Sequence, residues 1–102
     1  MSFVAAYTWR CQPGHEDELI RQSQDLRAHE TRLGAVIAAY RVVSGGDAGS
    51  IVFTATFDSE EHYAAWIDAL EGDPESVKIL DEIGNHDAWS MTAVATSISL
   101  DW

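Results

Sequence analysis

The chain opens with alternating side chains that predict a β-strand. Residues 3–11 (FVAAYTWRC) are rich in aromatic and β-branched residues and end at Pro13-Gly14, a pair typical of turns. Because successive strand side chains point to opposite faces, one face is expected to carry Phe3, Ala5, Tyr7 and Trp9, and the other Val4, Ala6, Thr8 and Arg10. Both faces of this strand are therefore largely apolar.

Helical spacing replaces the alternation from Glu16 to about Leu33. Acidic residues occupy the first turn, and Gly34 supplies a C-terminal stop. One narrow stripe of this segment holds Leu19, Ser23, Leu26, Glu30 and Leu33. The pattern predicts an amphipathic helix with this stripe turned inward.

Two apolar runs then flank a glycine-rich loop. Residues 35–43 and 50–57 each have strand character, and residues 44–49 (SGGDAG) between them predict a hairpin connection. The loop lacks the lysine and the following helix of a phosphate-binding loop, and the chain has no G-x-S-x-G nucleophile motif. Nucleotide-binding and hydrolase functions are therefore not indicated.

A second helix is expected after Asp58-Ser59, which offers an N-cap. Its inward stripe is Tyr63, Trp66, Ile67 and Leu70. Gly72-Asp73-Pro74 interrupts the helix and starts a short continuation that ends at Gly84. The expected inner side of the continuation is Val77, Leu80 and Ile83.

The last segment, residues 89–100, alternates again as a strand. Its expected faces are Trp89, Met91, Ala93 and Ala95 on one side and Thr92, Val94, Thr96 and Ile98 on the other. The resulting β-α-β-β-α-β order is that of an α+β, ferredoxin-like domain spanning residues 1–102, with a four-stranded antiparallel sheet and both helices on one face. Because the other face is also apolar, we expect a homodimer whose two sheets pack into a barrel.

Charge and length narrow the range of partners. The 17 acidic and six basic residues give a formal net charge of −11, which disfavours nucleic acid and anionic membranes as partners. No apolar run approaches the roughly 18 residues of a membrane span, and the single Cys11 excludes an internal disulfide. A soluble, cytoplasmic protein is expected.

Residues 10–70 resemble the dimeric α/β-barrel superfamily typified by antibiotic biosynthesis monooxygenase domains. The likeness lies in three pieces: Pro13-Gly14 with Glu16 to Glu18, residues 34–45 (GAVIAAYRVVSG) and residues 57–70 (FDSEEHYAAWIDAL). These motifs mark the fold better than the reaction. The resemblance implies a small homodimer with a pocket in each subunit between the helices and the sheet.

The same resemblance implies two kinds of chemistry. Some members oxidise polycyclic phenols or quinols without metal or flavin, and a related branch degrades haem. Trp66 occupies the position of a pocket tryptophan in the haem-degrading branch, but Tyr7 stands in place of its strand asparagine. Residues 67–76 (IDALEGDPES) contain no histidine for the iron. Haem degradation is therefore the lower-ranked alternative.

The histidines His15, His29, His62 and His86 do not predict a metal site, since no pair has the i, i+4 spacing of a helical metal motif. His86 is of more interest, because it lies beside Asp87 in a polar loop after the last helix. A histidine in such a loop can serve as a general base, although Asn85 and Asp87 are also typical of an ordinary turn.

The aromatic residues indicate a pocket. Tyr7 and Trp9 share a strand face, and Tyr63 and Trp66 share the inward face of the second helix, so all four can line one cavity for a planar aromatic ligand. Plain core packing is the alternative interpretation.

Our first hypothesis is a cofactor-independent monooxygenase acting on a small aromatic or quinol-type substrate. Tyr7, Trp9 and Trp66 would bind the substrate, and Tyr63 or His86 would handle a proton. The second hypothesis is a non-catalytic dimeric barrel protein that binds a small ligand or serves as an accessory subunit.

Overall fold

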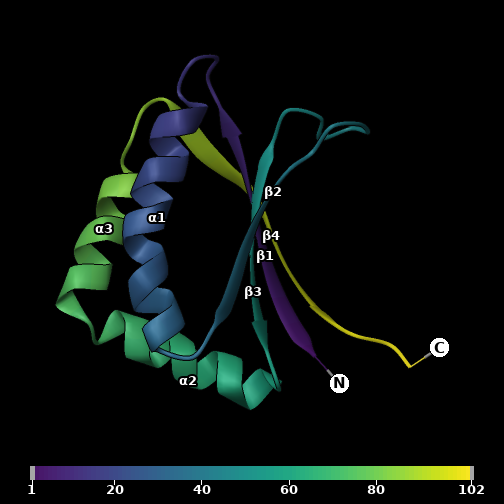
Figure 1. Cartoon of the computed structure of the whole chain (residues 1–102), viewed down its shortest axis with the longest axis vertical. Helices are drawn as coiled ribbons and strands as arrows, with labels where there is room; N and C mark the ends of the chain where they lie inside the picture. Colours follow the sequence, from purple (N-terminus) through teal and green to yellow (C-terminus); the bar gives the residue numbers. More distant parts are fainter. Residues whose placement is uncertain (1, 102) are drawn as a thin grey trace.

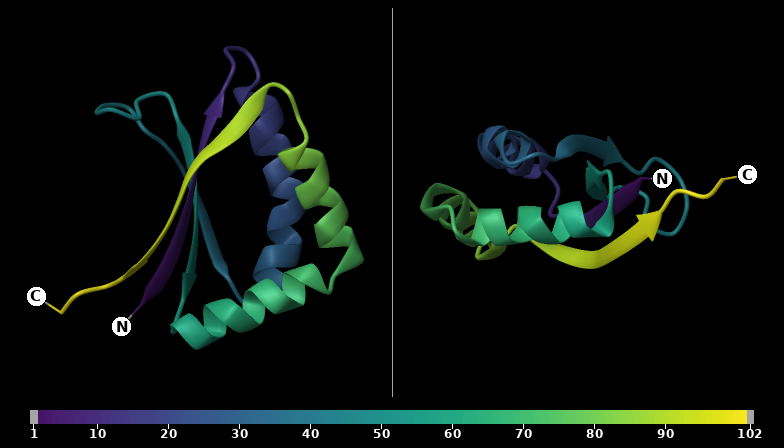
Figure 2. Two further views of the ribbon diagram at one scale, coloured as in Figure 1. Left: turned by 180° about the vertical axis from the view of Figure 1, so that it is seen from behind. Right: turned by 90° about the horizontal axis from the view of Figure 1, so that it is seen from below.

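The computed structural model describes residues 2–101 as two layers, a twisted sheet and a group of helices (Figure 1). The molecule measures 38 × 37 × 17 Å along its principal axes, so it is thin in one direction. All three helices lie on one side of the sheet, as seen from behind in Figure 2. The ferredoxin-like α+β fold predicted from the sequence is confirmed.

The sheet is antiparallel throughout, with the order β2-β3-β1-β4. The strands are β1 (Phe3–Cys11), β2 (Val36–Arg41), β3 (Ile51–Phe57) and β4 (Trp89–Ile98). The central strand β1 pairs with β3 on one edge and with β4 on the other, so the first and last strands lie side by side. Residues 3–11 form a strand with the predicted bounds.

The helices are α1 (Glu16–Arg32), α2 (Glu60–Glu71) and α3 (Pro74–Gly84). Ser59 caps α2 by accepting a hydrogen bond from the backbone N–H of His62, as the sequence predicted. Gly34 follows α1 with φ of +111°, and a Cβ atom at this position would lie 3.0 Å from Nε2 of His62. Glycine is therefore required here both for the backbone conformation and for space.

A β-bulge in β4 corrects the predicted faces of the last strand. Thr8 of β1 pairs with Ala93, but Trp9 pairs with Met91, so Thr92 is an extra residue in β4. The Thr92 hydroxyl donates to the Thr8 carbonyl oxygen at 3.3 Å. The bulge brings onto the helix-facing side both Trp89 and Met91 before it and Val94, Thr96 and Ile98 after it.

The inner side of α3 also differs from the prediction. Ser76 and Ile83 are buried and Ile79 packs against them, whereas Leu80 is 41% exposed. Ser76 tolerates burial because its hydroxyl donates to the Asp73 carboxylate at 2.6 Å. The hydrophobic pattern could not predict the burial of Ser76, because this polar residue is buried through its hydrogen bond to Asp73.

The core between the sheet and the helices consists of two clusters. The first, here the α2 cluster, contains Phe3, Ala35, Ala55, Phe57, Trp66 and Leu70. The second, here the α3 cluster, contains Leu19, Leu26, Ile51, Ile83, Ala88 and Trp89. Leu19 and Leu26 of α1 belong to the α3 cluster. Leu33, which directly follows α1, packs against the α2 cluster.

The sheet face opposite the helices, here the open face, is covered by no part of residues 2–101. Its middle row across the sheet is Ala38, Thr54, Ala6 and Ala95, all small side chains. The strands contain no acidic residue, although the chain has 17. The open face is therefore weakly polar, with small side chains along its middle, and free of the negative charge that dominates the rest of the molecule.

Candidate functional site

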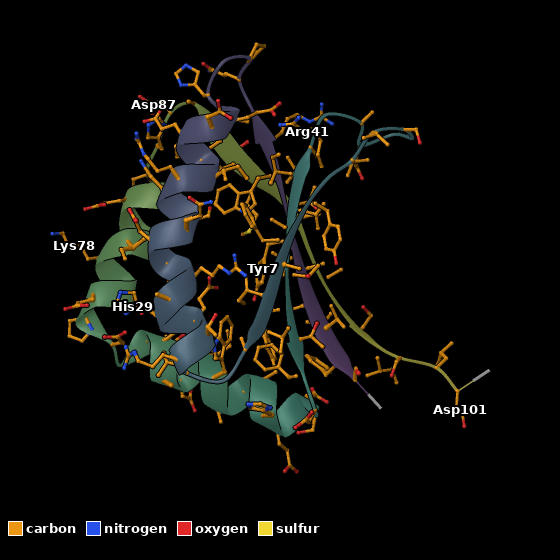
Figure 3. All side chains as sticks on the ribbon, in the orientation of Figure 1. Tyr7, His29, Arg41, Lys78, Asp87 and Asp101 are labelled. Atoms are coloured by element: carbon orange, nitrogen blue, oxygen red, sulfur yellow. The ribbon has the colours of Figure 1, made fainter. Side chains whose placement is uncertain are left out.

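Two tyrosine hydroxyls meet between the sheet and the helices. The Tyr7 side chain comes from the helix-facing side of β1, and the Tyr63 side chain comes from the first turn of α2 (Figure 3). Their oxygen atoms are 3.5 Å apart, a long hydrogen bond. Burial raises the pKa of Tyr7, as do its contact with Tyr63 and the charge of Glu30, so Tyr7 stays a protonated donor at neutral pH.

Glu30 is the third polar residue at this place. It lies in the last turns of α1, between Leu26 of the α3 cluster and Leu33 beside the α2 cluster. Within residues 2–101 no hydrogen-bond donor or cation contacts its carboxylate. Burial raises the pKa of this carboxyl to about 7, so at neutral pH about half of the molecules carry the charge.

Trp66 fixes the position of this part of α1. Its indole N–H donates to the Glu30 backbone oxygen at 3.0 Å, and its ring packs against Phe57 and Tyr63 with centroid distances of 5.0 and 6.3 Å. Trp66 is only 3% exposed. It therefore serves the site by holding α1 and α2 together beside Tyr63.

Trp9 occupies a different part of the interface. It shares the helix-facing side of β1 with Tyr7 but packs with the α3 cluster, whereas Tyr63 packs with the α2 cluster. Sharing a strand face thus places Trp9 near the hydroxyl pair without bringing it into contact with Tyr63. The structure joins Tyr7, Tyr63 and Trp66 and leaves Trp9 beyond them.

His86 lies at the other end of α1, where it contacts Glu18. The next residue, Asp87, is labelled in Figure 3. Its Nδ1 accepts from the Ala88 backbone N–H at 3.1 Å, so its Nε2 carries the proton toward Glu18, 3.2 Å away. Glu18 and Glu30 are twelve residues apart on α1, which is roughly 18 Å along the helix. The two residues predicted to handle a proton, Tyr63 and His86, therefore do not converge on one point.

His86 has a clear structural role in its own surroundings. Its ring stacks on Trp89 with a centroid distance of 3.8 Å and an interplanar angle of 9°. The hydrogen bond to Glu18 ties the loop before β4 to the first turn of α1. The partner of His86 is thus Glu18, and the neighbouring Asp87 is exposed.

The other histidines pair with carboxylates or aromatic rings near the surface. His15 lies 3.3 Å from Glu18, and His29 lies 3.5 Å from Asp73, which Arg32 also contacts at 3.1 Å. Residues 2–101 contain no group of three or more His, Cys, Asp or Glu side chains arranged to hold a metal ion.

Two hollows within residues 2–101 are open surface grooves. One lies between α1 and α3 beside His29 and Lys78, and the other lies beside Cys11 and Trp89. Neither groove is lined by Tyr7 or Tyr63, and Val94, the partner of Tyr7 on β4, is 51% exposed. No helix in this range is both long and apolar enough to cross a bilayer.

Glu30 is the site residue that the sequence analysis did not single out, although a signal was available. It stands on the apolar stripe of α1, four residues after Leu26 and three before Leu33. An acidic residue on the inward stripe of an amphipathic helix is unusual unless it is paired. The same helix buries the Gln22 Oε1 atom without a hydrogen-bond partner, so α1 presents a second polar atom to the interface.

Glu30 gives the folding stability a specific pH dependence. A carboxyl whose pKa is about 7 in the fold and 4.5 otherwise favours folding fully below pH 4.5, and this contribution is lost as the pH rises through 7. In urea unfolding at pH 8, the free energy of unfolding of Glu30→Gln is expected to exceed that of wild type by about 2 kcal/mol. At pH 4 the two proteins are expected to be equally stable. Asp25→Asn, on the exposed side of α1, is the control; equal differences at both pH values would contradict the burial of Glu30.

Comparison with known proteins identifies the fold. No protein-family model and no curated protein matches the sequence. Among solved structures, an uncharacterized NIPSNAP domain protein from Burkholderia xenovorans superposes with a TM-score of 0.75 at 21% identity, covering 96% of this chain and 94% of that one. A mutant of SnoaB, a cofactor-independent oxygenase from Streptomyces nogalater, gives 0.71 at 11% identity, covering 99% and 95%. The chain shares the ferredoxin-like α+β fold of these proteins.

A structure assigned to the antibiotic biosynthesis monooxygenases, from Chloroflexus aurantiacus, also superposes, with a TM-score of 0.62 at 17% identity over 100% of this chain and 96% of that one. The resemblance to this superfamily predicted from residues 10–70 is thereby confirmed for the fold. The matched structures include both a cofactor-independent oxygenase and an uncharacterized NIPSNAP domain protein. Shared architecture therefore leaves the activity to be argued from the site.

Proposed function

We propose that this protein is a cofactor-independent oxygenase that acts on a small phenolic or quinol-type aromatic compound. The observation that carries the proposal is the meeting of the Tyr7 and Tyr63 hydroxyls between the sheet and the helices, beside the aromatic rings of the α2 cluster. Hydroxyls 3.5 Å apart can both lie about 2.8 Å from one substrate oxygen atom. The likeness to a cofactor-independent oxygenase of the same fold supports the same reaction class.

The reaction needs little from the protein beyond binding and charge stabilisation. The keto tautomer of such a substrate, as in anthrone, loses a proton from its CH₂ group and becomes electron-rich enough to pass one electron to dioxygen. The resulting radical and superoxide combine and, with the return of one proton, form a hydroperoxide on that ring carbon. Loss of water then leaves a carbonyl, so that CH₂ and O₂ give C=O and H₂O. The Tyr7 and Tyr63 hydroxyls would hold the oxygen atom on which negative charge develops. Exclusion of water by the surrounding aromatic rings would strengthen both hydrogen bonds.

We further propose that the working unit is a homodimer joined through the open face. Two stacked open faces bring small side chains such as Ala6 and Thr54 against each other and keep acidic residues away from the contact. Such an interface needs to bury roughly 800 Å² per subunit to be stable. The exposed Val36 and Tyr40, on the same face of β2, would add apolar area.

Removal of the paired hydroxyls tests the oxygenase. Tyr63→Phe and Tyr7→Phe are each expected to lower oxygen uptake with anthrone by about 100-fold, because each loses one donor to the developing negative charge. Tyr40→Phe removes a hydroxyl from the opposite sheet face and serves as the control. An oxygen electrode measures the rates, and wild-type rates in both variants would contradict the proposed site.

A non-catalytic ligand-binding protein is the second candidate. It is favoured by the tight packing of Trp66 and by the position of the surface grooves away from Tyr63. Tryptophan fluorescence titration with anthrone, run beside the oxygen electrode, separates the two candidates. Binding without oxygen uptake would establish the second.

A further inference from the structure

We propose that Glu30 is the general base of this site and takes a carbon-bound proton from a substrate held by Tyr7 and Tyr63. This inference rests on the proposed function and adds the group that starts the reaction. In the step, the substrate C–H bond breaks, the proton goes to a Glu30 carboxylate oxygen, and the electron pair moves to the substrate oxygen held by the tyrosines. Dioxygen takes part only afterwards.

The first support is the placement of Glu30 between the two core clusters. Leu26, one turn earlier on α1, belongs to the α3 cluster, and Leu33 packs against the α2 cluster. Tyr7 pairs with Phe53 on the sheet below this boundary and carries its hydroxyl toward Tyr63. The three polar groups therefore share the one boundary between the two apolar clusters.

The second support is that the charged groups around Glu30 are engaged elsewhere. On α1, Arg32 and His29 both contact Asp73, which stands before α3. Arg41 of β2 contacts Glu16 at the start of α1. From β1, Tyr7 lies close enough for the charge of Glu30 to raise the Tyr7 pKa, and the Tyr7 hydroxyl carries no positive charge. Tyr63 of α2 contacts that hydroxyl.

A carboxylate in this position is suited to accept a proton. Because no cation or donor within residues 2–101 stabilises its charge, ionised Glu30 is a stronger base than a solvated glutamate. Its pKa of about 7 makes it half ionised at neutral pH, where a general base is most effective. The Trp66 hydrogen bond to the Glu30 backbone fixes the turn of helix that carries it.

The test separates proton removal from oxygen chemistry. Anthrone is incubated with the protein in D₂O without oxygen, and proton NMR follows the loss of the methylene signal. Wild type is expected to accelerate the exchange at least 10-fold over buffer, with a pH dependence that rises to a plateau above about pH 7. Glu30→Gln is expected to lose at least 90% of the acceleration, and Glu30→Asp to retain part of it.

Several outcomes would overturn the inference. Asp25→Asn, on the exposed side of the same helix, is the matched control and is expected to exchange at the wild-type rate. Exchange by Glu30→Gln at the wild-type rate, or no acceleration by wild type, would show that Glu30 is not the base. If Glu30→Gln keeps its oxygen uptake, the proposed oxygenase function stands and only the role of Glu30 as its base is rejected. Exchange that depends on Glu30 without any oxygen uptake would keep the base and reject the oxygenase.

Discussion

Trp66→Ala is expected to lower the free energy of unfolding by about 3–5 kcal/mol. The substitution removes a side chain that is 3% exposed and that contacts Phe57 and Tyr63. It also removes the indole donor to the Glu30 backbone oxygen, which then keeps only the Ala35 N–H as a partner. For a domain of this size, such a loss is a large share of the roughly 5–15 kcal/mol of total stability.

The measurement is urea unfolding followed by circular dichroism. Trp66→Phe, which keeps most of the ring volume, is expected to lose only about 1–2 kcal/mol. A loss of under 1 kcal/mol in Trp66→Ala would show that the α2 cluster does not depend on this residue. Because the alanine variant is destabilised in any case, Trp66→Phe is the variant to use when activity is compared.

Thr54→Glu is expected to turn the proposed dimer into monomers. Thr54 lies in the middle row of the open face, paired with Ala6 on one side and Ala38 on the other. A carboxylate there would be buried among the small side chains of the proposed contact, which costs several kcal/mol and raises the dissociation constant by more than about 100-fold.

Sedimentation velocity at micromolar concentration measures this change. Gln24→Glu adds the same charge on the exposed side of α1 and is expected to leave the dimer intact. A Thr54→Glu protein that sediments as a dimer would contradict the use of the open face. A wild-type protein that sediments as a stable monomer would contradict the dimer itself.

The fold was predictable because each element carries its own local signal. The alternation in residues 3–11, the Ser59 cap and the Asp73-Pro74 helix start all lie where the structure has the corresponding feature. The bulge at Thr92 carries no such signal, because threonine fits a regular strand equally well. Alternation counted from Trp89 therefore places every side chain after Thr92 on the wrong face.

The site was predictable only in part, since a strand face does not give the position along the strand. Tyr7, Trp9, Tyr63 and Trp66 were predicted to line one cavity. Of these, Tyr7 contacts Tyr63, and Tyr63 stacks on Trp66. Trp9 lies one pleat further along β1 and so enters the other cluster. For His86 the decisive fact is that it contacts Glu18 near the start of α1, whereas α2 contacts α1 near its end, through Trp66 and Glu30. Figure 1 shows α2 crossing this end of α1.

The additional residue in β4 has a consequence for how this strand can vary. Ala93, Ala95 and Ser97 now lie on the open face, and the bulkier Val94 and Ile98 lie on the helix side. A one-residue deletion near Thr92 would exchange these two sets along the whole second half of the strand. The number of residues in β4 near Thr92 is therefore more constrained than the identity of the side chains. Insertions or deletions there should be tolerated less readily than most single substitutions.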